Sequence, residues 1–203
     1  MVEIKGWLRI IVKALLGTVF IFICAQIAIP LGSIPMTLQD LSILIIAQLW
    51  RPLVTVLSII FYIVGISFGL PLAQGLLGGM SHMLGTTGGY IFGFLPMGYV
   101  VSKFKYNGMS LTNSFALCVL GQFFLYACGI SWLITHLGFE KSIKYGFYPF
   151  MYKIPLTILL SIVSTQLVKK RILYTKHLRI ALNELYKKIK EVLNDLKNTT
   201  SFF

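Results

Sequence analysis

The segment at residues 35–40, PMTLQD, brings a hydroxyl, an amide and a carboxylate to the expected start of a helix. Thr37 can cap that helix, with Asp40 at its third position, and capping would explain both residues without any ligand. Gln39 has no such structural role, and its amide can donate and accept hydrogen bonds toward a ligand. We therefore predict that Thr37 and Gln39 contact a small polar ligand.

Two glycine-rich segments, 69–75 and 85–90, supply the next candidates, which are Gln74, Thr87 and Tyr90. Glycine lets the backbone approach another backbone or a ligand closely. A helix is expected to begin at Thr87, and the free N–H groups of a helix start attract a carboxylate. Tyr90 adds a flat wall and a hydroxyl. Packing between helices is the alternative explanation for the glycines.

Two later helices supply the last candidates. Gln122, Tyr126 and Gly129 stand at i, i+4 and i+7, and therefore on one helix face. Lys153 lies about one turn inside an apolar stretch, where a cation costs ~2.5–3.5 kcal/mol at the bilayer centre and less near the edge. Pairing with a ligand carboxylate would offset that cost. The alternatives are hydrogen bonds between helices for Gln122 and Tyr126, and extension to the membrane surface for Lys153.

These residue types indicate binding rather than catalysis. In the apolar part of the chain, Asp40 is the one acidic residue near a helix, and His82 and His136 are the imidazoles. No nucleophile–base pair is evident, and the three cysteines lack the spacing of metal ligands. The sequence has no phosphate-binding GxxxxGK[ST] segment and no nucleic-acid module. We therefore expect no enzymatic activity, no metal, no cofactor and no nucleic-acid partner.

Composition indicates an integral membrane protein. The chain has 203 residues, of which 57% are hydrophobic and 12% are charged, and its mean hydropathy is +0.82. Between Ala14 and Ser102 the only charged side chains are Asp40 and Arg51. The same stretch is rich in Gly, Pro, Thr and Gln, and irregular backbone at membrane depth survives only where protein or a cavity covers it. This combination predicts a membrane protein that holds a small polar ligand.

Charge distribution predicts the membrane topology. Helices are expected at 7–29, 37–50, 52–68, 87–102, 112–136 and 148–168. A full span needs ~20 apolar residues, so two of these helices are short. If the N-terminus is cytoplasmic, 15 of the 18 Lys and Arg residues fall on the inner side, as the positive-inside rule requires. The fold class is therefore an all-α six-transmembrane-helix bundle with both termini in the cytoplasm.

The C-terminal part differs in composition from the bundle. We divide the chain into a membrane substrate-binding domain, 1–171, and a cytoplasmic or interfacial tail, 172–203. Apolar residues recur every three or four positions among many lysines, at Leu178, Leu182, Leu185, Ile189, Val192 and Leu196. This pattern predicts a basic amphipathic helix that contacts lipid at the inner leaflet. A helix that docks on a partner protein, or a short coiled coil, is the alternative.

Five segments, in the same order, resemble the BioY family, the biotin-binding S components of energy-coupling factor (ECF) transporters. They span about residues 14–170, and they are IPLGSIPMTLQ at 29–39, YIVGISFGLP at 62–71, GTTGGYIFGF at 85–94, YACGISWL at 126–133 and YPF at 148–150. The resemblance implies a six-helix protein of the bacterial plasma membrane that captures biotin from outside. It also implies a transmembrane coupling subunit and ATPase subunits as partners.

The resemblance has two departures. The family usually has Pro where this chain has Thr86, and it usually has Asp and Lys where this chain has Ile154 and Thr157. With biotin as the expected ligand, Gln39 and Gln74 would contact its ureido ring, the two tyrosines would line the pocket, and Lys153 with the helix start at Thr87 would favour its carboxylate. The alternatives are an S component for another vitamin or small carboxylate, and a membrane scaffold that transports nothing.

Overall fold

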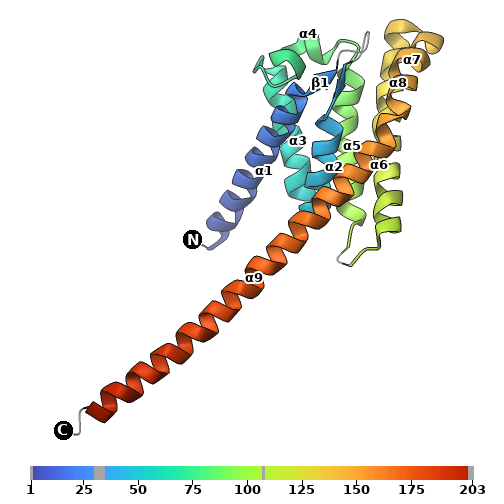
Figure 1. Cartoon of the computed structure of the whole chain (residues 1–203). Helices are drawn as coiled ribbons and strands as arrows, with labels where there is room; N and C mark the ends of the chain where they lie inside the picture. Colours follow the sequence, from blue (N-terminus) through green and yellow to red (C-terminus); the bar gives the residue numbers. More distant parts are fainter. Residues whose placement is uncertain (1, 30–34, 107, 201–203) are drawn as a thin grey trace. The chain divides into compact units, whose positions relative to one another are not determined.

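The computed structural model describes residues 2–29, 35–106 and 108–200. The predicted loop residues 30–34 lie outside the described residues. The chain forms two compact units, residues 1–165 and 166–203. Figure 1 shows the elements in sequence colours.

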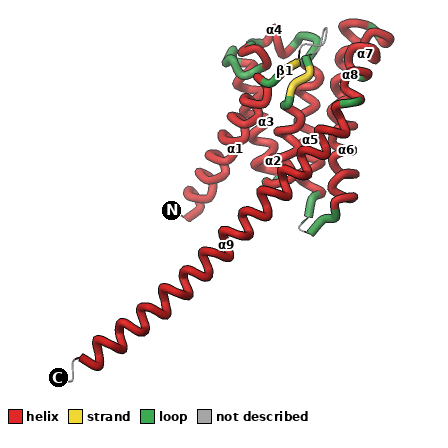
Figure 2. The backbone as a smooth tube through the Cα atoms, in the orientation of Figure 1, coloured by secondary structure: helices red, strands yellow, loops and turns green. Residues whose placement is uncertain are grey.

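Long helices make up most of the first unit (Figure 2). They are α1 (Val2–Gln26), α2 (Gln39–Leu49), α3 (Pro52–Ser67), α5 (Gly88–Phe104), α6 (Leu111–Leu137) and the first turns of α9 (Lys153–Thr200). α5 packs against α6, α3 and α2, and α1 packs against α3 and α2. Buried Ile158 and Ile162 of α9 belong to the same core, and Gln48 of α2 donates a 3.1 Å hydrogen bond to Ser161 of α9.

Short elements lie at the end of this unit where α1 and α3 finish (Figures 1 and 2). They are β1 (Ala28–Ile29), β2 (Met36–Thr37), the 3-10 helix η1 (Gln74–Leu76), α4 (Met80–Met83), α7 (Phe139–Gly146) and α8 (Tyr148–Met151). β1 and β2 pair antiparallel, with Ala28 opposite Thr37. Gln26 fastens η1 to α1, since its amide donates to Ala73 O at 2.9 Å and accepts from Leu76 N at 3.2 Å.

Local sequence explains where the long helices begin and end. Pro52 is the first residue of α3, where its missing N–H costs nothing, and Arg51 before it is extended. At the end of α2, the Lys105 ammonium donates to the carbonyls of Ala47 and Trp50, which would otherwise lack partners. Ser110 caps α6 by accepting from Asn113 N.

Glycine brings α5 and α6 together. A Cβ on Gly89 would lie 2.2 Å from Trp132 Cβ, and one on Gly93 would lie 3.0 Å from the carbonyl oxygen of Leu125. Both glycines therefore stand where only a hydrogen fits between the helices. The helix-packing explanation offered for the glycines of 85–90 is correct at Gly89, and Gly93 packs in the same way.

The six predicted helix ranges overlap α1, α2, α3, α5, α6 and α9. Among the described residues, two helices are long and apolar enough to cross a bilayer, Ile4–Gln26 and Leu111–Leu137. A third span exists if the bent pair of segments Phe139–Met151 and Lys153–Glu184 is counted as one helix. α2 and α3 are shorter apolar helices. The protein is therefore all-α and has candidate membrane-spanning helices. The total of six transmembrane helices stays a prediction.

α9 differs from its predicted range at both ends. It begins at Lys153, after the separate turn α8, and it continues through residue 168 to Thr200. No Gly or Pro follows Pro155, so nothing in the sequence stops the helix there. The described part of the second unit, 166–200, is helical throughout, and its apolar Leu178 and Leu182 are exposed within it. The side chains of 185 and 187–200, which include the predicted Leu185, Ile189, Val192 and Leu196, lie outside the described residues.

Candidate functional site

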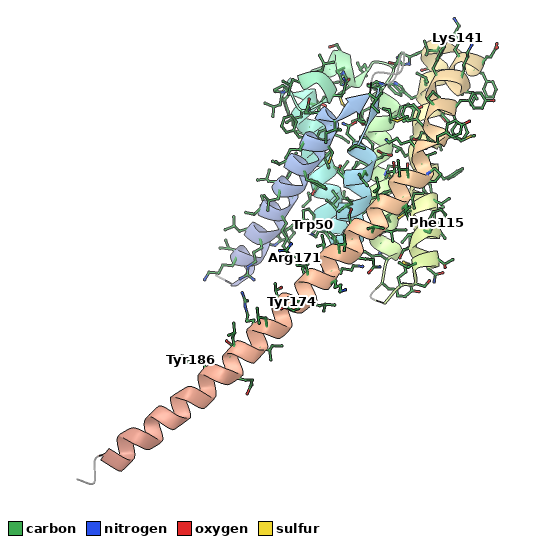
Figure 3. The ribbon with its side chains drawn as sticks, in the orientation of Figure 1. Trp50, Phe115, Lys141, Arg171, Tyr174 and Tyr186 are labelled. Carbon is green, nitrogen blue, oxygen red and sulfur yellow. The ribbon has the colours of Figure 1, made fainter. Side chains whose placement is uncertain are left out.

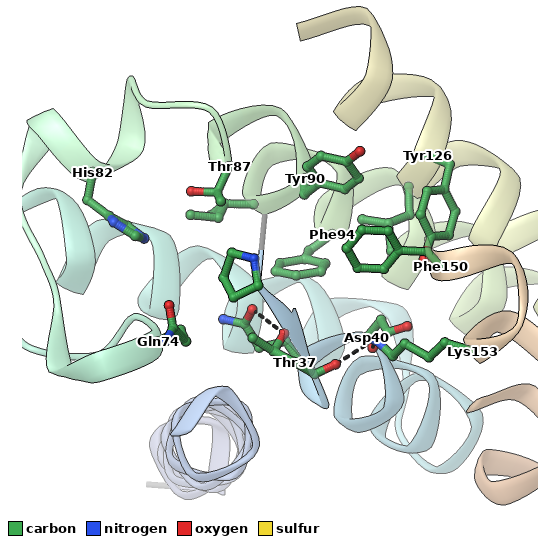
Figure 4. A pocket seen from close by; sticks show the side chains of 14 residues that line it. Thr37, Asp40, Gln74, His82, Thr87, Tyr90, Phe94, Tyr126, Phe150 and Lys153 are labelled. Atoms are coloured by element: carbon green, nitrogen blue, oxygen red, sulfur yellow. Dashed lines mark hydrogen bonds and ion pairs between the residues drawn. The ribbon is translucent and has the colours of Figure 1, made fainter. Parts of the chain in front are cut away.

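A pocket lies among α2, α5, α6 and the first turn of α9, under the short elements at the end of the first unit (Figure 4). Its empty volume is about 580 Å³, part of which is open to solvent. The cavity volume that compares with known pockets is about 60 Å³, below the ~300–1,000 Å³ that small-molecule pockets typically measure. The lining residues are Pro35, Thr37, Gln39, Asp40, Gln74, His82, Thr87, Tyr90, Ile91, Phe94, Leu125, Tyr126, Phe150 and Lys153.

The pocket gathers most of the residues that the sequence singled out. Seven of the eight predicted binding residues line it: Thr37, Gln39, Gln74, Thr87, Tyr90, Tyr126 and Lys153. Gln122 does not line it, but its Nε2 donates to Asp40 Oδ2 at 3.2 Å. Gln122 therefore acts on the pocket through Asp40.

A buried ion pair forms one end of the pocket. Lys153 Nζ lies 2.6 Å from Asp40 Oδ1 and also donates to Thr37 O at 2.5 Å, and the two charged side chains are only 9% and 4% exposed. Gln122 holds the second carboxylate oxygen. Lys153 therefore does not extend to the membrane surface, and its charge is balanced inside the protein. We call Asp40, Lys153 and the Thr37 carbonyl the charged corner.

The alternative explanation of Thr37 and Asp40, that they cap the helix, is wrong. α2 begins at Gln39, its N-cap is Leu38, and no side chain caps it. Thr37 Oγ1 instead donates to Gln39 Oε1 at 2.8 Å, because the β1–β2 pairing holds Thr37 outside the helix. Asp40 is therefore a pocket residue rather than the third residue of a capped helix.

The Gln39 amide is held in one orientation beside the charged corner. Its oxygen accepts from Thr37, and its nitrogen donates to the hydroxyl of Tyr62, which in turn donates to Leu72 O at 3.2 Å. A primary amide has two donor hydrogens and two acceptor lone pairs. One of each remains for a ligand.

Aromatic rings form the wall between the two ends of the pocket. The Tyr90 ring stacks with Phe150 at 6.2 Å between centroids and meets Tyr126 edge-on at 6.0 Å, and its hydroxyl donates to Gly146 O at 2.8 Å. A Cβ on Gly129 would lie 2.4 Å from the Tyr90 ring. Gly129 thus makes room for this ring, which lines the pocket.

Gln74, His82 and Thr87 lie at the other end of the pocket (Figure 4). Burial lowers the pKa of the His82 imidazole, so this end carries no charge at pH 7. The helix start here is less available to a carboxylate than expected, because Gly88 N and Tyr90 N donate to the carbonyls of Gly85 and Thr87. This end is polar but neutral.

Comparison with known proteins decides the family. The model of the BioY family matches residues 2–174. The chain belongs to the BioY family. A probable biotin transporter BioY of Rickettsia prowazekii is 32% identical over 145 residues, which cover 70% of this chain and 73% of the relative. The biotin transporter BioY of Thermotoga maritima is 32% identical over 146 residues, covering 71% and 86%.

The fold of this BioY-family chain has a solved counterpart. The crystal structure of an S-component for biotin from an ECF-type ABC transporter aligns with a TM-score of 0.68 at 23% identity, over 81% of this chain and 93% of that one. Membership of a transporter family agrees with the expectation of a non-enzymatic membrane protein.

Sequence reasoning missed half of the lining. The missed residues are Pro35, Asp40, His82, Ile91, Phe94, Leu125 and Phe150. Phe94 stands four positions after Tyr90 and Leu125 adjoins Tyr126, so both could have been found from their neighbours. Phe150 lies in the YPF segment that carried the resemblance to the BioY family. His82 had no signal, because only the turn from η1 to α4 brings it to the pocket.

Proposed function

We propose that this protein is the membrane substrate-capture (S) component of an ECF-type transporter and that it takes up biotin. Membership of the BioY family supports the transporter class. The observation that carries the ligand is the division of one pocket into a charged corner, an aromatic wall and a neutral polar end. Biotin has a ureido ring, an apolar thiophane ring and chain, and a carboxylate, and each part has a matching region.

The charged corner suits the ureido ring better than the carboxylate. A carboxylate at this corner would meet Asp40 as well as Lys153, and the like charges would repel. A ureido group offers N–H donors to the Asp40 carboxylate and a carbonyl to Lys153, whose ammonium has three donors, of which two are already used. We therefore place the ureido ring beside Asp40, Lys153 and Gln39, and the carboxylate toward Gln74 and Thr87.

This chain lacks the acid and the base that the family usually has on the last membrane helix. Ile154 and Thr157 stand at those positions. We infer that Lys153, on the same turn as Ile154, and Asp40 from α2 supply the missing charges. The pair is held by Gln122 and Thr37, which is why we retain both among the site residues.

We also propose six membrane spans, with both termini in the cytoplasm of a bacterium. The overlap of the six predicted ranges with long helices supports this topology, and so does the predominance of Lys and Arg on one side. No ATP-binding motif occurs in the sequence, so separate ATPase subunits and a transmembrane coupling subunit would energise transport.

Ligand identity is tested with the purified full chain. Radiolabelled biotin is equilibrated with the protein in detergent, and unlabelled biotin, thiamine, riboflavin, niacin and folate compete. We expect biotin alone to displace the label. Displacement by another vitamin would favour an S component of different specificity, and absence of any binding would favour a membrane scaffold.

Ligand orientation is tested in the same assay with biotin amide. Because the carboxylate is placed at the neutral end, the amide should compete within a few-fold of biotin, a difference of under ~1 kcal/mol. A loss of competition by the amide would place the carboxylate beside a cation such as Lys153 and contradict this placement.

Tyr90→Ala should weaken biotin binding strongly, because it removes the ring that stacks on Phe150 and lines the pocket. Truncating a buried aromatic ring to Ala typically also costs ~3–5 kcal/mol of folding stability. Tyr90→Phe keeps the ring and loses only the bond to Gly146, worth ~0.5–1.5 kcal/mol. Isothermal titration with biotin should show a larger loss of affinity in Tyr90→Ala than in Tyr90→Phe. Equal affinity of Tyr90→Ala and wild type would show that the Tyr90 ring does not contact biotin.

Deleting the tail after Ile172 should leave biotin affinity within about twofold of wild type, since all lining residues precede it. The same deletion should reduce attachment to anionic vesicles or to a partner, as expected of a basic amphipathic helix. Comparable losses of biotin binding and of these attachments would contradict the division at 171/172.

A further inference from the structure

A basic groove lies at the opposite end of the first unit from the biotin pocket. Its empty volume is about 1300 Å³ and open to solvent, and it is lined by Arg9, Ile10, Lys13, Leu49, Trp50, Arg51, Pro52, Leu53 and Val54. It lies between α1 and the break that separates α2 from α3. Figure 3 marks its position by Trp50, far from Lys141 of α7 at the other end.

Three cations line this groove, and its described lining includes no acidic residue. Arg9, Lys13 and Arg51 are exposed, and none of them has an ion-pair partner among the described residues. Arg9 and Lys13 stand at i and i+4 on α1, where like charges destabilise a helix by ~0.2–0.5 kcal/mol. The neighbouring Lys105 is already engaged with the end of α2. An anion between the three would relieve this repulsion.

The groove is built by packing rather than by flexible surface chains alone. A Cβ on Gly17 would lie 2.8 Å from the Trp50 ring, so glycine lets the indole lie against α1, one turn from Lys13. Arg51 is fixed in an extended conformation by Pro52 after it. The backbone thus presents cations from two separate segments to one space.

The surfaces beside the groove are apolar. Exposed aliphatic side chains flank it on α1 and α3, at Leu8, Val12, Leu16 and Leu53. A soluble anion would use only the cations, whereas a phospholipid would place its phosphate among them and its acyl chains along these side chains. Trp50 at the boundary is typical of a residue at the level of lipid headgroups.

We propose that this groove binds the phosphate headgroup of an anionic phospholipid of the inner leaflet. Arg9 and Arg51 contact the phosphate oxygens with their planar guanidinium groups, and Lys13 adds a point charge. Bound lipid then fixes α1 against the α2–α3 break at the end of the bundle where Lys and Arg predominate. This inference does not depend on biotin binding.

The test is native mass spectrometry of the full chain released from detergent, which measures how much lipid stays bound. Phosphatidylglycerol or phosphatidylcholine with the same acyl chains is added, or inorganic phosphate. The variant is Arg9→Gln/Lys13→Gln/Arg51→Gln. The control, Lys5→Gln/Lys103→Gln/Lys141→Gln, removes three exposed cations outside the groove. Monodisperse elution and an unchanged melting temperature in phosphatidylcholine establish that each variant is folded.

Wild type and control should retain one phosphatidylglycerol in preference to phosphatidylcholine. The groove variant should bind it about a hundredfold more weakly, the scale expected for three cations near an anionic surface. Equal binding by the groove variant, equal loss in the control, or no preference over phosphatidylcholine would each overturn the proposal. Displacement of the lipid by millimolar inorganic phosphate would overturn it also, because the site would then take a soluble anion.

Discussion

Replacing Lys153 with Met is expected to destabilise the protein by ~3–5 kcal/mol and to abolish measurable biotin binding. The substitution leaves the Asp40 carboxylate buried, with the Gln122 amide as its one side-chain partner among the described residues. An uncompensated buried charge is costly because neither water nor an opposite charge stabilises it. Thermal unfolding in detergent measures the first effect, and isothermal titration with biotin measures the second.

A double variant separates stability from binding. Asp40→Asn/Lys153→Met removes both charges, and it should regain most of the lost stability because no charge is left unpaired. It should still fail to bind biotin, since the charged corner is gone. Lys141→Met, at an exposed position of α7, should change neither quantity. Normal biotin affinity in Lys153→Met, or a double variant no more stable than Lys153→Met, would contradict these roles.

Gly129→Ala should lower biotin affinity by at least about tenfold, equivalent to ~1.4 kcal/mol. The new methyl group would lie 2.4 Å from the Tyr90 ring, which must move toward the pocket that it lines. Insertion of extra volume into a packed site also costs ~1–3 kcal/mol of stability. Biotin titration and thermal unfolding of the same preparation would measure both effects.

Gly6→Ala provides the matched control for that substitution. A Cβ on Gly6 of α1 has nothing within 4 Å, so the change should raise helix stability by ~0.5–1 kcal/mol and leave biotin affinity unchanged. If Gly129→Ala behaved like Gly6→Ala, the close approach of Gly129 to the Tyr90 ring would have no part in forming the site.

Hydropathy and helix breakers predict the long helices because both are local properties. Pro52 determines where α3 begins, and the scarcity of charged residues between Ala14 and Ser102 marks the apolar bundle. The short elements could not be predicted in this way. A strand of two residues or a helix of four has no periodicity to detect, and its position depends on contacts such as those of Gln26 with Ala73 and Leu76.

The sequence predicted which residues line the candidate site better than it predicted which of them contact one another. Thr37, Gln39, Tyr90, Tyr126 and Lys153 were identified because polar groups, including tyrosine hydroxyls, are unusual inside the membrane part of a chain. Their partners depend on tertiary structure. Asp40 and Lys153 stand 113 positions apart, and neither local sequence indicates that they pair.

The most direct test is a structure of the full chain with biotin bound. The account predicts that the ureido ring lies within hydrogen-bond distance of Asp40, Lys153 or Gln39, against Tyr90 and Phe150, with the carboxylate toward Gln74. Biotin bound outside this pocket, or its carboxylate on Lys153 and its ureido ring at His82, would contradict the account.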